Sequence, residues 1–151
     1  MRIKILTDNP KDDKKTLDSN KFVIVDKDET HILIELSNDN ILGKKNSIIK
    51  PINPSKVLYV ESFGNDIFCH TEKDRYKIDS KLYEYVDEYS KLGFIQINKS
   101  CVININYITS IYPLVNMRYI VKLSNNDELF VTRTYLKAFK KRIKGGNHGI
   151  L

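Results

Sequence analysis

The stretch Phe94–Ile105 constrains the fold of this chain more than any other feature. It is an apolar run that is broken in the middle by three polar residues, Asn98, Lys99 and Ser100, and it becomes apolar again after them. A run with such a break makes a poor core strand on either side, but it suits a pair of strands that holds a short polar loop rigidly at the surface. The loop carries three side chains that donate hydrogen bonds, so we interpret it as a contact with a partner.

Short apolar runs of a similar kind recur along the chain. They are rich in β-branched and aromatic residues and are bounded by turn residues, which is typical of antiparallel strands and hairpins. We expect a basic hairpin turn at 43–46, restricted pairing at Pro51 and a strand end at Pro113. Asn104 is expected to bond to backbone where its strand ends. The predicted strands are 2–6, 22–25, 31–36, 41–42, 47–52, 56–62, 67–71, 75–78, 94–97, 101–104, 107–112, 118–123 and 129–132.

Two helices complete the predicted secondary structure. The first covers about 80–92, because Asp79 or Ser80 suits the N-cap, apolar residues repeat at helical spacing, and Gly93 suits the position after the end. Its outer face is acidic, so we expect it to lie away from any polyanion. The second covers about 134–143 and directs its lysines outward. The predicted fold class is therefore mostly β, with antiparallel sheets, one short helix and a C-terminal basic helix.

Length and composition predict one domain with small additions at its ends. The chain has 151 residues, and a polar break at 37–40 divides a small β appendage at 1–40 from a main domain at 41–144. Residues 145–151 are predicted to be a flexible tail. The two cysteines are too few for a disulfide framework, and no apolar run approaches the ~20 residues that a membrane span needs. The first residues do not form a signal peptide, so we expect a cytoplasmic protein.

Positive charge is concentrated in the last third of the chain. The net charge is +6 at pH 7, and residues 96–151 hold nine basic residues against two acidic ones. Residues 1–95 are close to balance, with 16 basic and 17 acidic residues. This asymmetry is typical of a surface that binds a polyanion such as nucleic acid, and its plain alternative is a solvated basic surface.

The residue pattern does not indicate catalysis or a metal site. His31, His70 and His148 are scattered, and neither an HExxH nor a Cys-x-x-Cys spacing occurs. Cys69 and His70 are adjacent on a predicted strand, so they point to opposite faces. Cys101 is interpreted as a buried structural thiol. We predict no enzyme activity, no cofactor and no bound metal.

Six segments keep a distinctive order over about a hundred residues, as a family alignment would require. They are Leu58-Tyr-Val-Glu-Ser62, Ser80-Lys-Leu82, Phe94-Ile-Gln-Ile-Asn-Lys-Ser100, Val102-Ile-Asn104, Ile108-Thr-Ser-Ile111 and Leu129-Phe-Val-Thr-Arg133. In this order, residues 41–143 resemble the LytTR-type DNA-binding domain of bacterial transcription regulators.

The resemblance implies an elongated fold of antiparallel β-sheets whose loops, rather than a recognition helix, enter successive major grooves of double-stranded DNA. The contacting positions that it carries over are the turn at Asn65, the loop of Asn98, Lys99 and Ser100, and Arg133. Lys99 and Arg133 can reach guanine O6 and N7, and Asn65 can pair with adenine. Ser100 can reach a base or a phosphate.

Lys137 and the other lysines of the basic helix are expected to contact phosphates, which position a protein without reading sequence. The plain alternatives are a structural ion pair of Arg133 with Glu128 or Glu61, and a role for Asn65 in turn geometry alone. Lys99 has the alternative of an ordinary surface lysine.

Many relatives carry a phospho-acceptor receiver domain ahead of this module, and the first forty residues are too few to hold one. The chain therefore resembles the stand-alone class, for which control comes from a regulatory partner protein, from self-association as a homodimer or from a modification. The resemblance also implies paired repeats as the DNA target. This chain departs from many members at Thr132, where they have Ser, and at Asp127, where they have Gly.

Two other functions stay open on the sequence alone. One is an OB-like module that binds single-stranded nucleic acid and stacks bases on some of the nine tyrosines. The other is a regulatory protein-interaction β domain whose basic face meets an acidic partner.

Overall fold

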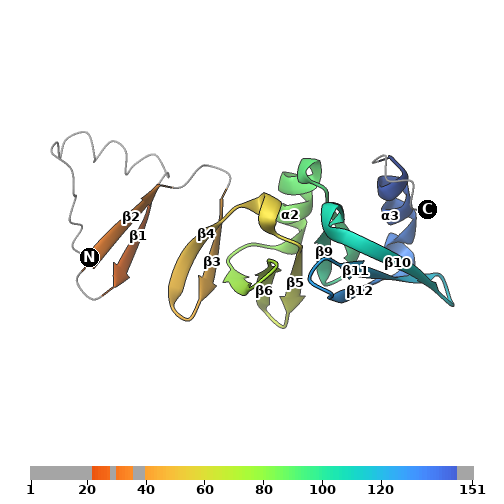
Figure 1. Ribbon diagram of the computed structural model, residues 1–151, viewed down its shortest axis with the longest axis horizontal. Coiled ribbons are helices and arrows are strands. Elements are labelled where there is room, and N and C mark those ends of the chain that lie inside the picture. Colours follow the sequence, from red (N-terminus) through yellow and green to blue (C-terminus); the bar gives the residue numbers. More distant parts are fainter. Residues whose placement is uncertain (1–21, 28–29, 36–39, 146–151) are drawn as a thin grey trace.

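The computed structural model describes residues 22–27, 30–35 and 40–145 (Figure 1). The predicted strand at 2–6 and the part of the predicted tail after Gly145 lie outside the described residues. The helices are α2 (Leu82–Tyr89) and α3 (Arg133–Gly145), and the 3₁₀ helices are η1 (Pro54–Lys56), η2 (Ser90–Leu92) and η3 (Ile105–Tyr107). The strands are β1 (Phe22–Lys27), β2 (Thr30–Glu35), β3 (Ile41–Lys45), β4 (Ile48–Ile52), β5 (Tyr59–Phe63), β6 (Asp66–His70), β7 (Arg75–Ile78), β8 (Phe94–Asn98), β9 (Cys101–Asn104), β10 (Ile108–Leu114), β11 (Arg118–Leu123) and β12 (Glu128–Val131).

The strands pair antiparallel throughout the described part of the chain. Seven of them form one sheet in the order β4-β3-β7-β6-β5-β9-β8, and three form a second sheet in the order β10-β11-β12. Strands β1 and β2 pair with each other in a two-stranded sheet. The predicted class, mostly β with antiparallel sheets, a short helix and a C-terminal helix, is confirmed.

Strand β9 and the start of β5 are buried on both faces. Val60 and Val102, which pair across the two strands, belong to a core that α2 covers. Tyr59 and Ile103, the next pair, point the opposite way into a second core that α3 covers. The expectation that the broken run makes a poor core strand is wrong for β9, in which every residue is buried. The reason is that a different helix covers each face of this strand.

Helix α3 completes the second core with Leu136, Phe139 and Ile143, whose spacing places them on one side of the helix. The Tyr59 hydroxyl donates a hydrogen bond to Asp127 Oδ2 over 2.9 Å. This bond joins the seven-stranded sheet to the turn between β11 and β12. Asp127 therefore has a structural partner in this chain.

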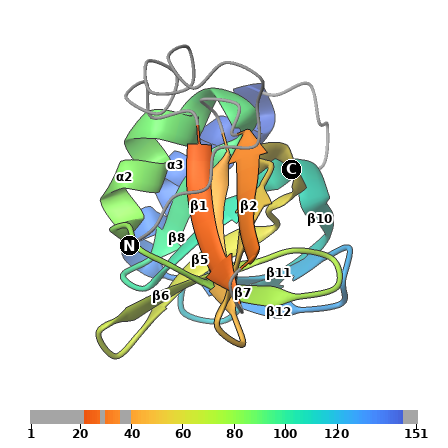
Figure 2. The ribbon, with the colours of Figure 1, turned by 90° about the vertical axis from the view of Figure 1, so that its left-hand side faces the viewer.

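Helix α2 begins slightly later than predicted. Lys81 takes the N-cap position, and its backbone N–H donates to the Glu84 carboxylate over 3.0 Å. The chain continues as η2 to Leu92, and Gly93 ends it with a left-handed φ of 99°, as expected. Figures 1 and 2 show α2 on the side of the molecule opposite the turn between β5 and β6. The acidic helix therefore lies away from that turn.

The hairpin turn between β3 and β4 lies further along the chain than predicted. Gly43 is a strand residue in β3, and a Cβ added there would come within 2.7 Å of Tyr76 Cβ. The close approach of β7 therefore requires glycine at this position. The turn falls instead at Asn46 and Ser47, which both have positive φ.

Both prolines that lie within strands occupy edge strands. Pro51 pairs with Leu42 in β4, and Pro113 pairs with Tyr119 in β10. The expected strand end at Pro113 is wrong, because β10 continues to Leu114. Proline is tolerated there because an edge strand leaves one row of backbone groups without a neighbouring strand.

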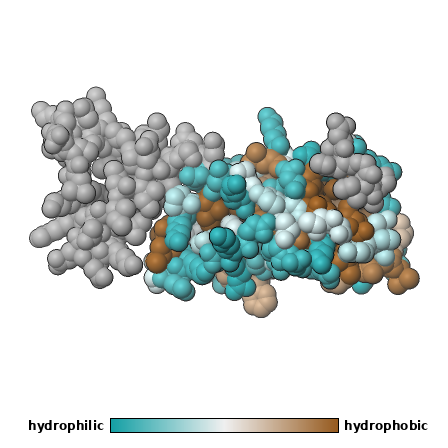
Figure 3. Space-filling model, viewed as in Figure 1, coloured by the Kyte–Doolittle hydropathy of each residue, from teal (hydrophilic) through white to brown (hydrophobic). Residues whose placement is uncertain are grey.

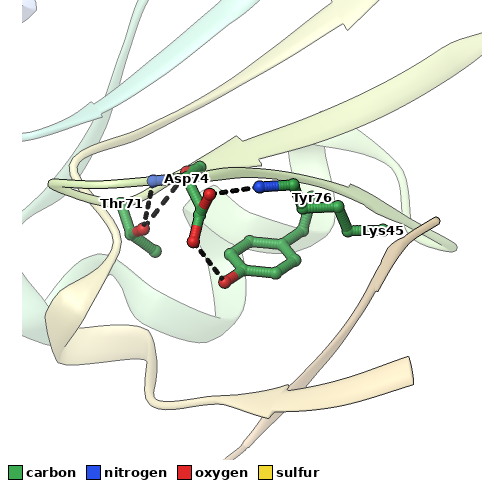
Figure 4. A network of polar contacts seen from close by, with 4 residues as sticks. All are labelled: Lys45, Thr71, Asp74 and Tyr76. Carbon is green, nitrogen blue, oxygen red and sulfur yellow. Dashed lines mark hydrogen bonds and ion pairs between the residues drawn. The ribbon is translucent and has the colours of Figure 1, made fainter. Parts of the chain in front are cut away.

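A network around Asp74 supports the pairing of β3 with β7, which spans only Gly43↔Ile78 and Lys44↔Lys77. Asp74 forms an ion pair with Lys45 and accepts a hydrogen bond from the Tyr76 hydroxyl over 3.2 Å (Figure 4). Its backbone N–H donates to Thr71 Oγ1 over 3.2 Å. The hydrogen bond from Lys45 is the main reason that the pKa of the Asp74 carboxyl is lowered.

Candidate nucleic-acid interface

The loop between β8 and β9 is closed by the side chain of Asn98. Its Oδ1 accepts hydrogen bonds from the backbone N–H of Ser100 over 2.9 Å and from the Ser100 hydroxyl over 3.1 Å. Asn98 pairs with Cys101 across the ladder, so Lys99 and Ser100 form the tip of the turn. Both tip residues are exposed. Asn98 therefore shapes the loop, and Lys99 projects from it into solvent.

Three further hydrogen bonds hold this loop between two other segments. The Ser100 carbonyl accepts from Ser62 N–H over 2.8 Å, and Ser62 lies in β5 shortly before the β5–β6 turn. Asn98 Nδ2 donates to the Phe130 carbonyl of β12 over 2.9 Å. Thr132 N–H, directly before Arg133, donates to the Ile97 carbonyl over 3.0 Å. The structure thus brings together the three segments that the sequence singled out.

The β5–β6 turn consists of Gly64 and Asn65, between the paired residues Phe63 and Asp66. Gly64 adopts a φ of 61°, whereas Asn65 is not in the left-handed region, so only the first of the two needs the freedom of glycine. Asn65 is exposed at the tip. Phe63, beside it, is 76% exposed. Phe63 was not among the predicted contact residues, although an aromatic residue directly before Gly-Asn was a visible signal.

Arg133 is the first residue of α3 and is exposed. Within the described residues it forms no ion pair with Glu128 or Glu61, and the Glu61 carboxylate lies 2.8 Å from His70 Nε2 instead. The first turn of α3 contains no acidic residue. A cation at a helix N-terminus opposes the helix dipole and costs about 0.3–1 kcal/mol. Arg133 and the dipole together make this end of α3 attractive to an anion.

The basic residues of α3 continue from Arg133 along the helix. Lys137 follows one turn later and is exposed, as are Lys141 and Lys144 further along. Lys140 Nζ lies 5.0 Å from the centroid of the Tyr119 ring. The apolar side of the helix is buried in the second core, so the opposite side presents positive charge to solvent.

A purely apolar patch lies away from these loops. Hydrophobic residues gather at the end of the molecule that holds the β10–β11 turn (Figures 1 and 3), where Val115 and Met117 are exposed. The loop cluster around Lys99 instead combines exposed polar and basic residues with two exposed aromatic residues, Phe63 and Phe130. Such a surface suits a polyanion better than an apolar partner.

The cysteines and His70 have structural environments. Burial raises the pKa of the Cys69 thiol to about 12, and burial also raises that of Cys101. A high pKa keeps both thiols protonated and unreactive at neutral pH. Burial lowers the pKa of His70 and outweighs the opposing effect of Glu61, and the His70 ring stacks on Tyr59 with centroids 4.0 Å apart. These groups support the sheet.

Asn104 is 1% exposed and bonds to backbone at the end of its strand, as expected. Among the described residues, no group of His, Cys, Asp and Glu side chains could hold a metal ion. The described helices also include none that is long and apolar enough to cross a membrane.

Comparison with known proteins decides the family. The sequence model of the LytTr DNA-binding domain matches residues 47–144. The chain belongs to the LytTr DNA-binding domain family. This is a family of DNA-binding domains and not of enzymes. The matched residues include the β5–β6 turn, the β8–β9 loop and all of α3 but its last residue.

Curated relatives of the LytTr family are regulators of greater length. The chain is 26% identical over 93 residues to the sensory transduction protein LytT of Bacillus cereus, which covers 62% of this chain and 38% of that protein. It is 26% identical over 119 residues to the sensory transduction protein LytR of Staphylococcus haemolyticus, which covers 73% of this chain and 46% of that protein. It is 31% identical over 74 residues to the transcriptional regulatory protein LytR of Staphylococcus aureus, covering 49% of this chain and 30% of that protein. The chain thus spans less than half the length of each.

A solved LytTr domain has the same fold. It comes from a putative methyl-accepting/DNA response regulator of Bacillus cereus and superposes with a TM-score of 0.67. The match covers 71% of this chain and 98% of that domain, at 23% sequence identity. At this identity the likeness supports the fold.

Proposed function

We propose that this protein is a transcription regulator that binds specific sequences in double-stranded DNA with three loops. The observation that supports this most is the hydrogen-bonded cluster in which Ser62, Ser100 and Thr132 join the β5–β6 turn, the β8–β9 loop and the start of α3. Membership of a DNA-binding family supplies the partner. The regulatory role is drawn from the relatives that are named as transcriptional regulators.

In this proposal the exposed side chains of the cluster read bases. Lys99 projects from a loop that other residues close, so its three donors are available for guanine O6 and N7. Arg133 has no ion pair among the described residues, and its planar fork fits the same edge bidentately. Asn65 is assigned to adenine. A well-made bidentate contact discriminates by roughly 1–3 kcal/mol.

The remaining candidates have supporting roles. The amide of Asn98 forms hydrogen bonds with the Phe130 carbonyl and with Ser100, so we propose that Asn98 maintains the shape of the loop. Ser100 Oγ donates to Asn98 and keeps acceptor capacity toward water or DNA. Lys137 and the basic side of α3 are assigned to phosphates. If about five phosphates are neutralised, the logarithm of affinity falls with the logarithm of salt concentration with a slope of roughly −4.5.

The three segments are proposed to enter successive major grooves, and paired repeats are the proposed target. The purified chain would be used to select bound duplexes from a random pool, and the selected site would then be footprinted. We expect protection of the selected site that persists in excess random duplex.

The decisive experiment compares the DNA affinity of variants that each lose one positive charge. Lys99→Ala and Arg133→Ala should each weaken binding to the selected site by about tenfold, corresponding to roughly 1.4 kcal/mol. Lys56→Ala is the matched control, because Lys56 is exposed and precedes the end of β5 opposite the β5–β6 turn. Protection that survives Lys99→Ala and Arg133→Ala combined in one chain would refute the proposal. Tighter binding to single strands than to duplex would also refute it and would favour the OB-like alternative.

A further inference from the structure

A cleft of about 600 Å³ lies between the C-terminal half of α3 and the segment where η2 leads into β8. It is lined on one side by Ala138, Lys141 and Arg142, and on the other by Lys91 and Leu92. Arg133 and Arg142 are nine positions apart on α3, which corresponds to roughly 13.5 Å along the helix axis. The cleft is therefore separate from the loop cluster, although both depend on the same helix.

The lining combines an apolar floor with positive charge. Leu92, Ile95 and Ala138 contribute apolar surface, and Leu92 is 41% exposed. Lys141 and Arg142 are joined there by Lys91, and none of the described residues that line the cleft is acidic. None of these three cations forms an ion pair with a described residue. Charge complementarity therefore requires an anionic occupant, and the floor requires that it also carry an apolar body.

The walls are preformed. Arg142 Nη2 donates to the Ser90 carbonyl and so bridges α3 to η2 at the cleft. Asn106 Nδ2 donates to the Leu92 carbonyl over 2.9 Å. A Cβ on Gly93 would come within 2.9 Å of that same Asn106 nitrogen, so the floor is packed tightly at this point. A ligand that enters such a cleft does not have to order its walls, which lowers the cost of binding.

We propose that this cleft binds a small amphipathic carboxylate, with its carboxylate at Lys91, Lys141 and Arg142 and its apolar body against Leu92, Ile95 and Ala138. The occupied cleft lowers DNA affinity, because the bound carboxylate neutralises Lys141 on the basic side of α3 that the proposed function assigns to phosphates. The binding step stands on the cleft alone, whereas the effect on DNA rests on the function proposed above.

The probe is 2-naphthoate, and its neutral amide, 2-naphthamide, is the matched control ligand. Isothermal titration of the full chain should show the carboxylate binding at least tenfold more tightly than the amide, as expected for the loss of one charge-assisted contact. Ala138→Trp fills the cleft from an exposed position, so it should abolish binding of both without unfolding the chain. Lys141→Gln with Arg142→Gln should weaken only the carboxylate. Lys56→Gln changes charge outside the cleft and should have no effect.

Equal binding of the two probes, or unchanged binding by Ala138→Trp, would overturn the proposal. A third result would also overturn the proposal. If the unaltered chain does not bind 2-naphthoate, and Lys141→Gln with Arg142→Gln weakens DNA binding, the cleft holds a DNA phosphate instead. The DNA arm measures affinity for the selected duplex with and without saturating 2-naphthoate, and an unchanged affinity would refute the regulatory step. If the chain does not bind DNA at all, the titration still decides whether the cleft binds the carboxylate.

Discussion

Replacement of Asn98 by alanine tests whether this residue shapes the β8–β9 loop. The change removes the hydrogen bond to the Phe130 carbonyl at 2.9 Å and the two bonds from Ser100 at 2.9 and 3.1 Å. Three neutral hydrogen bonds at about 1 kcal/mol each set an upper limit of about 3 kcal/mol. Because the loop is exposed, water replaces part of this loss. We expect the free energy of unfolding to fall by about 1–2 kcal/mol.

The same change should weaken DNA binding although Lys99 and Arg133 remain. Without its anchor the loop is ordered only when DNA binds, and each immobilised side chain then costs about 0.5–1.5 kcal/mol. We therefore expect the affinity for the selected duplex to fall by about three- to tenfold. Affinity would be measured by titration at 25 °C, and stability by urea unfolding. Ser100→Ala, which removes only the 3.1 Å bond, is the matched control for stability and should change the free energy of unfolding little.

Two results would refute this reasoning. An unchanged free energy of unfolding would show that the three bonds do not hold the loop. A loss of DNA binding without any loss of stability would show that Asn98 contacts DNA directly, as the family resemblance implied, rather than acting on Lys99.

Three further predictions concern single side chains. Phe63→Ala should leave the free energy of unfolding within about 0.5 kcal/mol, because Phe63 is 76% exposed, yet it should reduce affinity for the selected duplex; equal affinity would exclude Phe63 from the interface. Burial lowers the pKa of His70 below its ordinary 6.5, so the unfolded chain takes up the proton first, and the free energy of unfolding should fall as pH drops below about 6.5. Urea unfolding at several pH values would measure this pH dependence, and His70→Gln should make the dependence weaker. An equally strong pH dependence in the variant would show that other groups cause it. Phe139→Ala should destabilise the chain by about 3–5 kcal/mol, because Phe139 is fully buried in the core that α3 covers; calorimetry that shows a loss below 1 kcal/mol would contradict the packing described for α3.

Local chemistry accounts for the parts of the fold that the sequence predicted. Gly93 was recognised as the residue that follows the first helix, and it has a positive φ in the structure. The apolar spacing of Leu136, Phe139 and Ile143 predicted the buried side of α3. These features depend on residues that are neighbours along the chain, so short-range patterns are sufficient to detect them.

The predictions of strand ends and turns were wrong where the local structure depends on residues that are distant in the sequence. Pro113 stays within a strand because β10 is an edge strand, and edge position depends on the order of the whole sheet. Gly43 lies within a strand because Tyr76, far along the chain, packs where a Cβ would be. Neither fact can be read from the residues on either side.

The sequence by itself determined the alternation of strands and turns, the basic end of the chain and the family to which residues 47–144 belong. It also singled out Asn65, Lys99 and Arg133 as separate candidates. Only the tertiary structure decided that β9 is buried on both faces, that the three segments meet through Ser62, Ser100 and Thr132, and that a basic cleft lies beside α3. The physical reason is that periodicity specifies which residues share a face, whereas what covers that face depends on elements far away in the sequence.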